Sequence, residues 1–232
     1  MMLMLPFVWL SYTILNGKQA NDVAFKFLNV WAFGFNTLMG YRYKILNREF
    51  VKKDKAYIFI VNHNSYLDAL AVVRVIPQSF KPLGKIEMTK IPIFGFIYKR
   101  LVVLIDRSSK KSRDQSVLAL KNQIAIGQSI LIFPEGTMNK TSDHLTDFYD
   151  GAFRIAIETQ TPILPFNIIN TKGLMPRLNP TAIKPGLITC VFSPEFEVKG
   201  LTLEDLPQLK AKVFAEMEAQ LIQFKGLPKQ AN

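Results

Sequence analysis

One of the two histidines in this 232-residue chain has an acidic residue at a chemically useful spacing. His63 follows the apolar run of residues 56–61, and Asp68 comes five residues later, where a helical pattern begins. A neutral imidazole can take a proton at pH 7, and a carboxylate on its other nitrogen fixes the tautomer. The pair therefore suits a general base that activates a hydroxyl group.

A structural reading of the same stretch remains open. Ser65 precedes Asp68 by three residues, which is the spacing of a helix capping box. In that arrangement the Asp68 carboxylate would bond to main-chain amides at the start of the helix. The stretch alone does not decide between catalysis and capping.

Two further loops carry polar residues directly after apolar runs. Asp106 and Arg107 follow residues 101–105, and Glu135, Gly136 and Thr137 follow residues 130–133. The planar guanidinium of Arg107 suits a phosphate, and Gly136 lets main-chain amides approach a ligand closely. Each loop alone is typical of a solvated strand end, but their order along the chain indicates one site.

Short apolar runs alternate with helical patterns along the chain, which predicts an α/β fold with helices flanking a sheet. We expect strands at 56–61, 80–84, 101–105, 130–133, 163–169 and 187–198, and helices at 65–76, 113–126, 151–159 and 207–224. Each polar motif then follows a strand, where such sheets collect their ligand sites.

Residues 1–45 are predicted to form a membrane-associated two-helix segment, and residues 46–232 the main domain. The first 15 residues are apolar but short for a span, which needs about 20 residues, and they lack a signal-peptide cleavage pattern. Asp22, Lys26, Asn29 and Asn36 then recur at helical intervals among aromatic residues, before the basic and aromatic residues 41–44. This pattern favours two helices dipping into one leaflet, with a hairpin packed on the protein's own core as the alternative.

The composition narrows the classes of partner. A formal net charge of +11 suits nucleic acid, a phospholipid surface or an acidic carrier protein. We set nucleic acid aside, because no basic readout helix or zinc-finger signature is present. The single cysteine, Cys190, allows no intramolecular disulfide, and two histidines without a cysteine pair argue against a structural zinc ion.

Taken together, these motifs resemble the glycerolipid acyltransferase family, especially the 1-acyl-sn-glycerol-3-phosphate acyltransferases. The first family block is matched by Asn62, His63 and Asp68, the second by Ile105, Asp106 and Arg107, the third by Phe133, Pro134, Glu135, Gly136 and Thr137, and the fourth by residues 161–165. Lys85 lies in a stretch similar to the basic segment that precedes the second block. The likeness covers roughly residues 50 to 200, and four ordered blocks make chance agreement improbable.

The resemblance implies a mixed central sheet and a defined reaction. His63, held by Asp68, would take the proton of an acceptor hydroxyl as that hydroxyl attacks an acyl thioester of acyl carrier protein or coenzyme A. No cofactor is implied, and the product would be phosphatidate, made by a monotopic enzyme on the cytoplasmic face of the membrane. The residues expected to bind substrate are Asn62, Lys85, Arg107, Glu135, Gly136 and Thr137, with Arg107 on the phosphate.

Two departures from the family pattern leave the acceptor open. Met138 stands where many relatives have arginine, and Tyr149 and Asp150 stand where lysine or arginine is common. Less positive charge fits another lysophospholipid or an aminolipid as well as lysophosphatidate. Two other classes also remain: a thioester hydrolase that uses water as the acceptor, and a non-catalytic membrane-binding domain.

Overall fold

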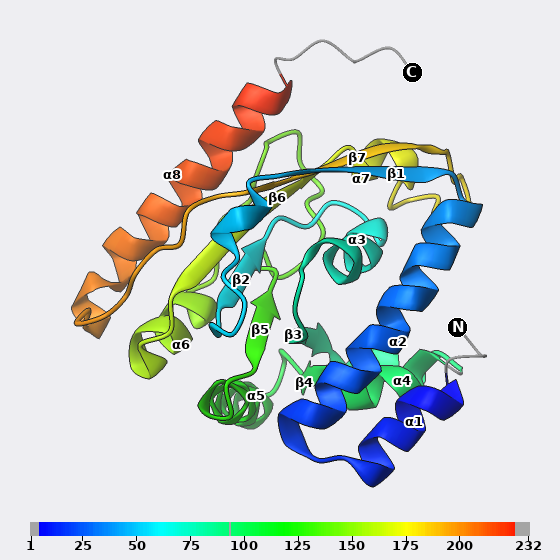
Figure 1. Cartoon of the computed structure of the whole chain (residues 1–232). Coiled ribbons are helices and arrows are strands. Elements are labelled where there is room, and N and C mark those ends of the chain that lie inside the picture. Colours follow the sequence, from blue (N-terminus) through cyan, green and yellow to red (C-terminus); the bar gives the residue numbers. More distant parts are fainter. Residues whose placement is uncertain (1–4, 93, 226–232) are drawn as a thin grey trace.

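A sheet of seven strands forms the centre of the molecule (Figure 1). The strands are β1 (Tyr41–Leu46), β2 (Ile58–Val61), β3 (Phe80–Lys85), β4 (Val103–Ile105), β5 (Ser129–Ile132), β6 (Ile163–Ile169) and β7 (Gly186–Phe192). They lie in the order β1-β7-β6-β2-β5-β3-β4, and all neighbours are parallel except β6 and β7. The predicted α/β fold with a mixed central sheet is confirmed.

Helices cover both faces of this sheet. They are α1 (Leu5–Ile14), α2 (Gly17–Leu38), α3 (Leu67–Val75), α4 (Phe94–Leu101), α5 (Lys110–Ala125), α6 (Gly151–Thr159), α7 (Thr171–Leu174) and α8 (Leu206–Lys225), with 3-10 helices η2 (Arg48–Phe50), η3 (Ile86–Lys90) and η4 (Leu203–Asp205). This computed structural model describes residues 5–92 and 94–225. Residues 1–4 of the predicted N-terminal segment, Ile93 of the predicted basic segment and residues 226–232 lie outside the described part.

Strand β2 explains why the sheet is covered on both sides. Phe59 and Val61 join the apolar cluster that includes Leu67 of α3. Ile58 and Ile60 point to the opposite face, into the cluster formed with α6 and α8. A strand buried on both faces reads as an uninterrupted apolar run, which is why the sequence predicted it.

Strand β1 begins at Tyr41, so the sheet starts before the predicted domain boundary between residues 45 and 46. We expected residues 41–44 to meet lipid headgroups at the end of a helix, but they pair with β7 in a parallel ladder. Gly40 makes the change of direction possible, because it adopts a positive φ of 70° directly after α2. A Cβ atom at Gly40 would lie 2.8 Å from Cβ of Pro185.

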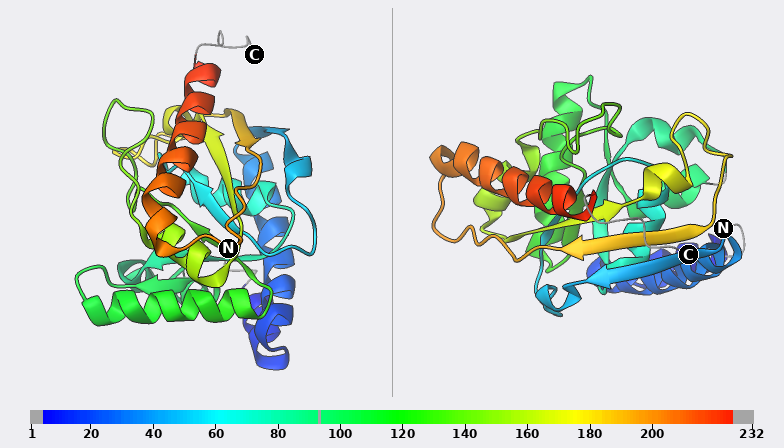
Figure 2. Two further views of the ribbon diagram at one scale, coloured as in Figure 1. Left: turned by 90° about the vertical axis from the view of Figure 1, so that its left-hand side faces the viewer. Right: turned by 90° about the horizontal axis from the view of Figure 1, so that it is seen from above.

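Helices α1 and α2 pack against each other at the end of the molecule away from α8 (Figures 1 and 2). Two residues of the predicted polar stripe of α2 face the protein, whereas Lys26 is exposed. Asn29 Nδ2 donates to Val73 O at 2.8 Å, and Asn36 Oδ1 accepts from Tyr43 Oη at 2.8 Å. The outward surface is mixed, because Lys18, Gln19 and Lys26 are exposed beside several large apolar residues. We call the apolar part of this surface the hairpin face, and its members are Trp9, Leu10, Ile14, Val30, Phe33 and Leu38, exposed by 46 to 78%.

None of the helices in residues 5–92 and 94–225 is both long enough and apolar enough to cross a membrane, and this includes α1 and α2. The predicted contact with a membrane therefore stays a prediction at this point.

Candidate active site

The loop between β2 and α3 lies where three parallel strands end together. Strand β2 pairs with β5 on one side and β6 on the other, so its carboxyl end meets the segments that follow both neighbours. The His63 imidazole stacks on the Phe133 ring, which comes just after β5, with 4.2 Å between ring centroids and 25° between planes. The sheet thus brings the first and third sequence motifs into contact.

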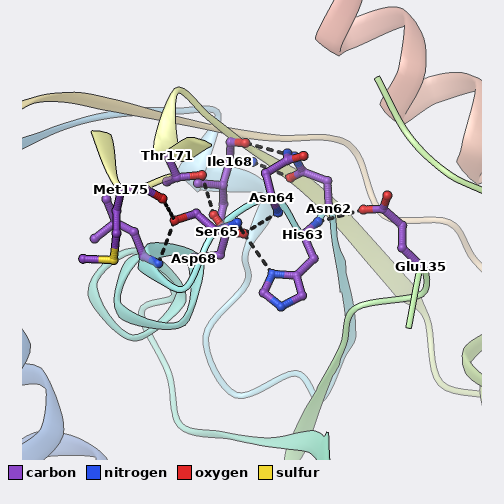
Figure 3. Close-up of polar contacts among 10 residues, drawn as sticks. Asn62, His63, Asn64, Ser65, Asp68, Glu135, Ile168, Thr171 and Met175 are labelled. Carbon is purple, nitrogen blue, oxygen red and sulfur yellow. Dashed lines mark hydrogen bonds and ion pairs between the residues drawn. The ribbon is translucent and has the colours of Figure 1, made fainter. Parts of the chain in front are cut away.

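His63 and Asp68 form a hydrogen-bonded pair in this loop (Figure 3). Nδ1 of His63 lies 2.9 Å from Oδ2 of Asp68. The Asp68 side chain is 1% exposed and that of His63 18%, so the carboxylate is enclosed while the ring reaches solvent. Nε2 of His63 makes no hydrogen bond to the residues that the structure describes, and Figure 3 shows it pointing away from Asp68.

Asp68 also binds the loop itself. Its Oδ2 accepts main-chain hydrogen bonds from Asn64 at 2.6 Å and Ser65 at 2.8 Å. Oγ of Ser65 accepts from the Leu67 amide at 3.1 Å. One carboxylate therefore holds both the imidazole and two amides that precede α3, but the predicted capping box is not formed, since the N-cap of α3 is Tyr66 and has no side-chain cap. The catalytic reading stays a prediction.

Asn62 is fully buried and turned toward β6. Its Nδ2 donates to Ile168 O at 2.9 Å, and its Oδ1 accepts from Ile168 N at 2.7 Å (Figure 3). Both polar ends are thus occupied by one main-chain partner. Holding the loop against β6 accounts for these contacts, and the predicted contact of Asn62 with substrate remains a prediction.

Glu135 is 3% exposed and bonds to two segments. Its Oε1 accepts from the His63 amide at 2.7 Å, and its Oε2 accepts from Thr146 N at 3.0 Å and Thr146 Oγ1 at 2.9 Å. Burial raises the pKa of this carboxyl, and the hydrogen bonds from His63 and Thr146 oppose that shift. Glu135 therefore fixes the main chain of the histidine from the side opposite Asp68.

Arg107 reaches the same loop from β4. One of its Nη atoms donates to Gly136 O, and desolvation lowers its pKa from the ordinary value. Gly136 has a φ of 71°, and a Cβ atom there would lie 2.9 Å from Arg107 Nη1 and 2.7 Å from Tyr149 Cε2. The glycine therefore permits both the backbone turn and the close approach of the guanidinium.

Lys85 and Thr137 are placed differently from the other predicted residues. Lys85 is exposed at the end of β3, and Thr137 is exposed beside Gly136. Neither side chain makes a hydrogen bond within residues 5–92 and 94–225. They are not joined to the dyad by direct contacts, and they stay available to a ligand.

Sequence reasoning missed Thr171, Thr146 and Asn139. Thr171 Oγ1 donates to Asp68 Oδ1 at 2.5 Å, and Asn139 N donates to His63 O at 2.7 Å. Thr171 follows the end of a predicted strand, as the other motifs do, but that position alone does not indicate its contact with Asp68. Thr146 and Asn139 lie in an irregular loop, which gave no such signal.

A histidine hydrogen-bonded to a buried carboxylate thus lies at the carboxyl ends of parallel strands, an arrangement that suits a general base. The sequence model of the family described as Acyltransferase matches residues 42–169, which is more than half of the chain. The protein therefore belongs to the acyltransferase family, and it is an acyltransferase enzyme.

Individual relatives agree with this assignment. An uncharacterized acyltransferase of Schizosaccharomyces pombe is 30% identical over 82% of this chain and 68% of its own length. The 1-acyl-sn-glycerol-3-phosphate acyltransferase alpha of Mus musculus is 28% identical over 76% of this chain and 62% of its own length. The corresponding enzyme of Chlamydomonas reinhardtii is 29% identical over 70% of this chain but 49% of its own length, so the chain spans about half to two thirds of these relatives.

The fold itself also occurs in a solved structure. The crystal structure of the 1-acyl-sn-glycerophosphate acyltransferase PlsC from Thermotoga maritima matches with a TM-score of 0.78 at 21% identity. The match covers 98% of this chain and 91% of that chain. At this identity the likeness describes the fold.

Proposed function

We propose that the protein is a 1-acyl-sn-glycerol-3-phosphate O-acyltransferase, which moves an acyl group from a thioester to the free hydroxyl of lysophosphatidate and forms phosphatidate. The observation that carries the proposal is the His63–Asp68 pair, 2.9 Å apart, in which the second ring nitrogen makes no hydrogen bond to the described part of the chain. The family assignment supplies the reaction class, and the names of the mouse and algal relatives support the acceptor.

The chemistry follows from this geometry. Asp68 holds the proton on Nδ1, so Nε2 presents a lone pair to the acceptor hydroxyl. As the hydroxyl oxygen attacks the thioester carbonyl, Nε2 takes its proton and the new carbon–oxygen bond forms. Collapse of the tetrahedral intermediate breaks the carbon–sulfur bond, and the imidazolium returns the proton to the leaving thiolate of acyl carrier protein or coenzyme A.

Arg107 and Lys85 are our candidates for the acceptor phosphate. Among the residues that the structure describes, the Arg107 side chain donates to Gly136 O alone, and its other N–H groups are proposed to bind the phosphate. Thr137, exposed next to Gly136, completes the set of predicted substrate contacts. Met138 contributes no charge, so Arg107 and Lys85 are expected to supply most of the phosphate-binding charge.

The hairpin face supports contact with the surface of a phospholipid bilayer. Helix α2 docks with small and amide residues buried and with Phe25 and Phe35 packed on the core, yet it leaves Val30, Phe33 and Leu38 exposed on its other side. Large apolar residues left outside in this way are typical of helices that lie in a lipid interface. The proposal places the enzyme as a monotopic protein on the cytoplasmic face, where its donors and acceptor meet.

Vesicle sedimentation tests the membrane part. A protein with Val30→Ser and Phe33→Ser, residues that are 63 and 55% exposed, should lose most of its binding to phospholipid vesicles. The matched control is Leu203→Ser with Ile222→Ser, which are 48 and 53% exposed near the opposite end of the molecule. Equal vesicle binding by both double variants would refute membrane contact through the hairpin face.

Acyl transfer tests the enzymatic part. Labelled oleoyl thioester is offered with a panel of lyso-acceptors in detergent micelles, and wild type is compared with His63→Ala. Loss of the base should reduce transfer to lysophosphatidate about 10²- to 10⁴-fold. His144→Ala, the same change at the chain's other histidine, should leave it within a few-fold.

Two outcomes would change the proposal. His63-dependent transfer to a different lyso-lipid alone would keep the mechanism and overturn the acceptor, with Met138 and Tyr149 as the residues to exchange. Transfer that survives His63→Ala would overturn the general-base mechanism itself.

A further inference from the structure

The Asp68 carboxylate takes part in four hydrogen bonds. One of them comes from a segment to which we have assigned no catalytic role. Oδ2 is used by His63, Asn64 and Ser65, all in its own loop. Oδ1 accepts from Oγ1 of Thr171, which lies 103 residues further along the chain. Thr171 is 1% exposed, so this bond is shielded from water.

The position of Thr171 follows from the end of β6. Asn170 takes a left-handed conformation, with φ 77°, and the chain turns directly from β6 into the short helix α7. The turn places the threonine hydroxyl over the Asp68 carboxylate (Figure 3). Asn62, which binds Ile168, fixes the strand immediately before this turn.

The other end of α7 is tied to the same loop. Oγ of Ser65 donates to Met175 O at 2.7 Å, just after the last residue of α7. The segment 168–175 is thus bonded to the loop 62–68 at its start, middle and end. These contacts between the two segments restrict the Asp68 carboxylate to one orientation. A carboxylate without such partners rotates about its χ2 bond at small energetic cost.

We propose that Thr171 is a positioning residue of the dyad, whose hydroxyl holds Oδ1 of Asp68 so that Oδ2 faces Nδ1 of His63. This inference rests on the proposed general-base function of His63. Without the hydroxyl, Oδ1 loses its buried donor and only the three hydrogen bonds to Oδ2 orient the carboxylate, so the imidazole is held in the catalytic orientation for a smaller fraction of the time.

The test compares three variants of the full chain. Thr171→Val keeps the size and removes the donor, Thr171→Ser keeps the donor and removes a methyl group, and Thr159→Val makes the same change in α6, where the hydroxyl bonds to Ile155 O. We expect Thr171→Val to reduce kcat about 10- to 100-fold, the rate equivalent of a hydrogen bond to a charged group, with KM for both substrates unchanged. Thr171→Ser should restore most of the rate, and Thr159→Val should leave it unchanged.

A spectroscopic measurement separates this inference from the proposed function. The proton on Nδ1 of His63 should give a downfield imidazole resonance by NMR, absent in His63→Ala, that shifts or broadens in Thr171→Val and returns in Thr171→Ser. An unchanged resonance and unchanged kcat in Thr171→Val would overturn the positioning role, even if His63→Ala is inactive. Equal losses in the Val and Ser variants would also overturn it, because the hydroxyl would then not be the group that matters.

Discussion

Oε1 of Glu135 accepts a hydrogen bond from the main-chain amide of His63 at 2.7 Å. A carboxylate that follows β5 therefore sets the backbone position of a residue that follows β2. His63 is consequently held at two points: Asp68 binds its imidazole ring, and Glu135 binds its main-chain amide.

This relationship predicts a rate effect for Glu135→Gln. An amide offers one acceptor oxygen, but Glu135 accepts from His63 on one oxygen and from Thr146 on the other. One of those donors would then face an NH₂ group, so kcat should fall about 10-fold or more while KM for the acyl donor is kept. Steady-state kinetics checks this, with Glu158→Gln on the surface of α6 as the matched control. A rise in KM with normal kcat would instead indicate a direct contact with substrate.

Gly136→Ala should disturb the Arg107 side of the site. The new methyl group would meet Arg107 Nη1 and Tyr149, and the left-handed backbone would cost about 1–2 kcal/mol in the free energy of unfolding. Gly127→Ala is a sharp control, because Gly127 has φ 75° and nothing within 4 Å of the added atom. Both variants should lose similar stability, and only Gly136→Ala should raise KM for the lyso-acceptor. Equal KM values would mean that Arg107 does not contact the acceptor phosphate.

Asn62→Leu should act on stability more than on substrate binding. The change removes both hydrogen bonds to the buried main chain of Ile168, at a cost of about 3 kcal/mol in the free energy of unfolding. Urea denaturation measures this, with Asn122→Leu on the exposed surface of α5 expected to be near neutral. A stable Asn62→Leu protein with a raised KM would favour the alternative, in which Asn62 contacts the substrate.

The buried Lys81 should make the free energy of unfolding rise with pH in mild alkali. Burial lowers the pKa of this lysine to about 8 from an ordinary 10.5, and its ammonium is 2.6 Å from Arg100 O. Between these values the unfolded chain binds more protons than the folded protein, so the free energy of unfolding increases with pH. Burial raises the pKa of the neighbouring Tyr12, which stays neutral across this window.

The Lys81→Met variant isolates this effect. Relative to the variant, wild type should gain up to about 1.4 kcal/mol per pH unit from pH 8 towards pH 10. Denaturation in urea at several pH values would measure the difference. A constant gap between the two proteins over this range would show that Lys81 titrates normally.

The parts of the site that the sequence predicted are those set by short distances along the chain. His63 and Asp68 are five residues apart, and strands β2, β5 and β6 are buried on both faces, so spacing and apolar runs located them. Strand β1 escaped notice because its residues alternate between buried and exposed positions and its partner β7 is remote in sequence.

Thr171 was missed for a related reason. A threonine after a strand carries no sign of the carboxylate that it will meet, and the contact exists because β6 lies next to β2 in the sheet. Side-chain roles that depend on strand order need the structure. The direction of α2 is a similar case, since its polar stripe was visible but the side that it faces was not.

The parallel pairing of β1 with β7 has a consequence for biosynthesis. Tyr41 lies opposite Gly186, so the first strand leaves the ribosome long before its partner exists. At about 5–20 residues per second, the sheet edge must wait on the order of ten seconds to close. During that interval the residues of α1 and α2, including those of the hairpin face, have already been synthesised, so a lipid bilayer near the ribosome would meet them before the catalytic loop has been assembled.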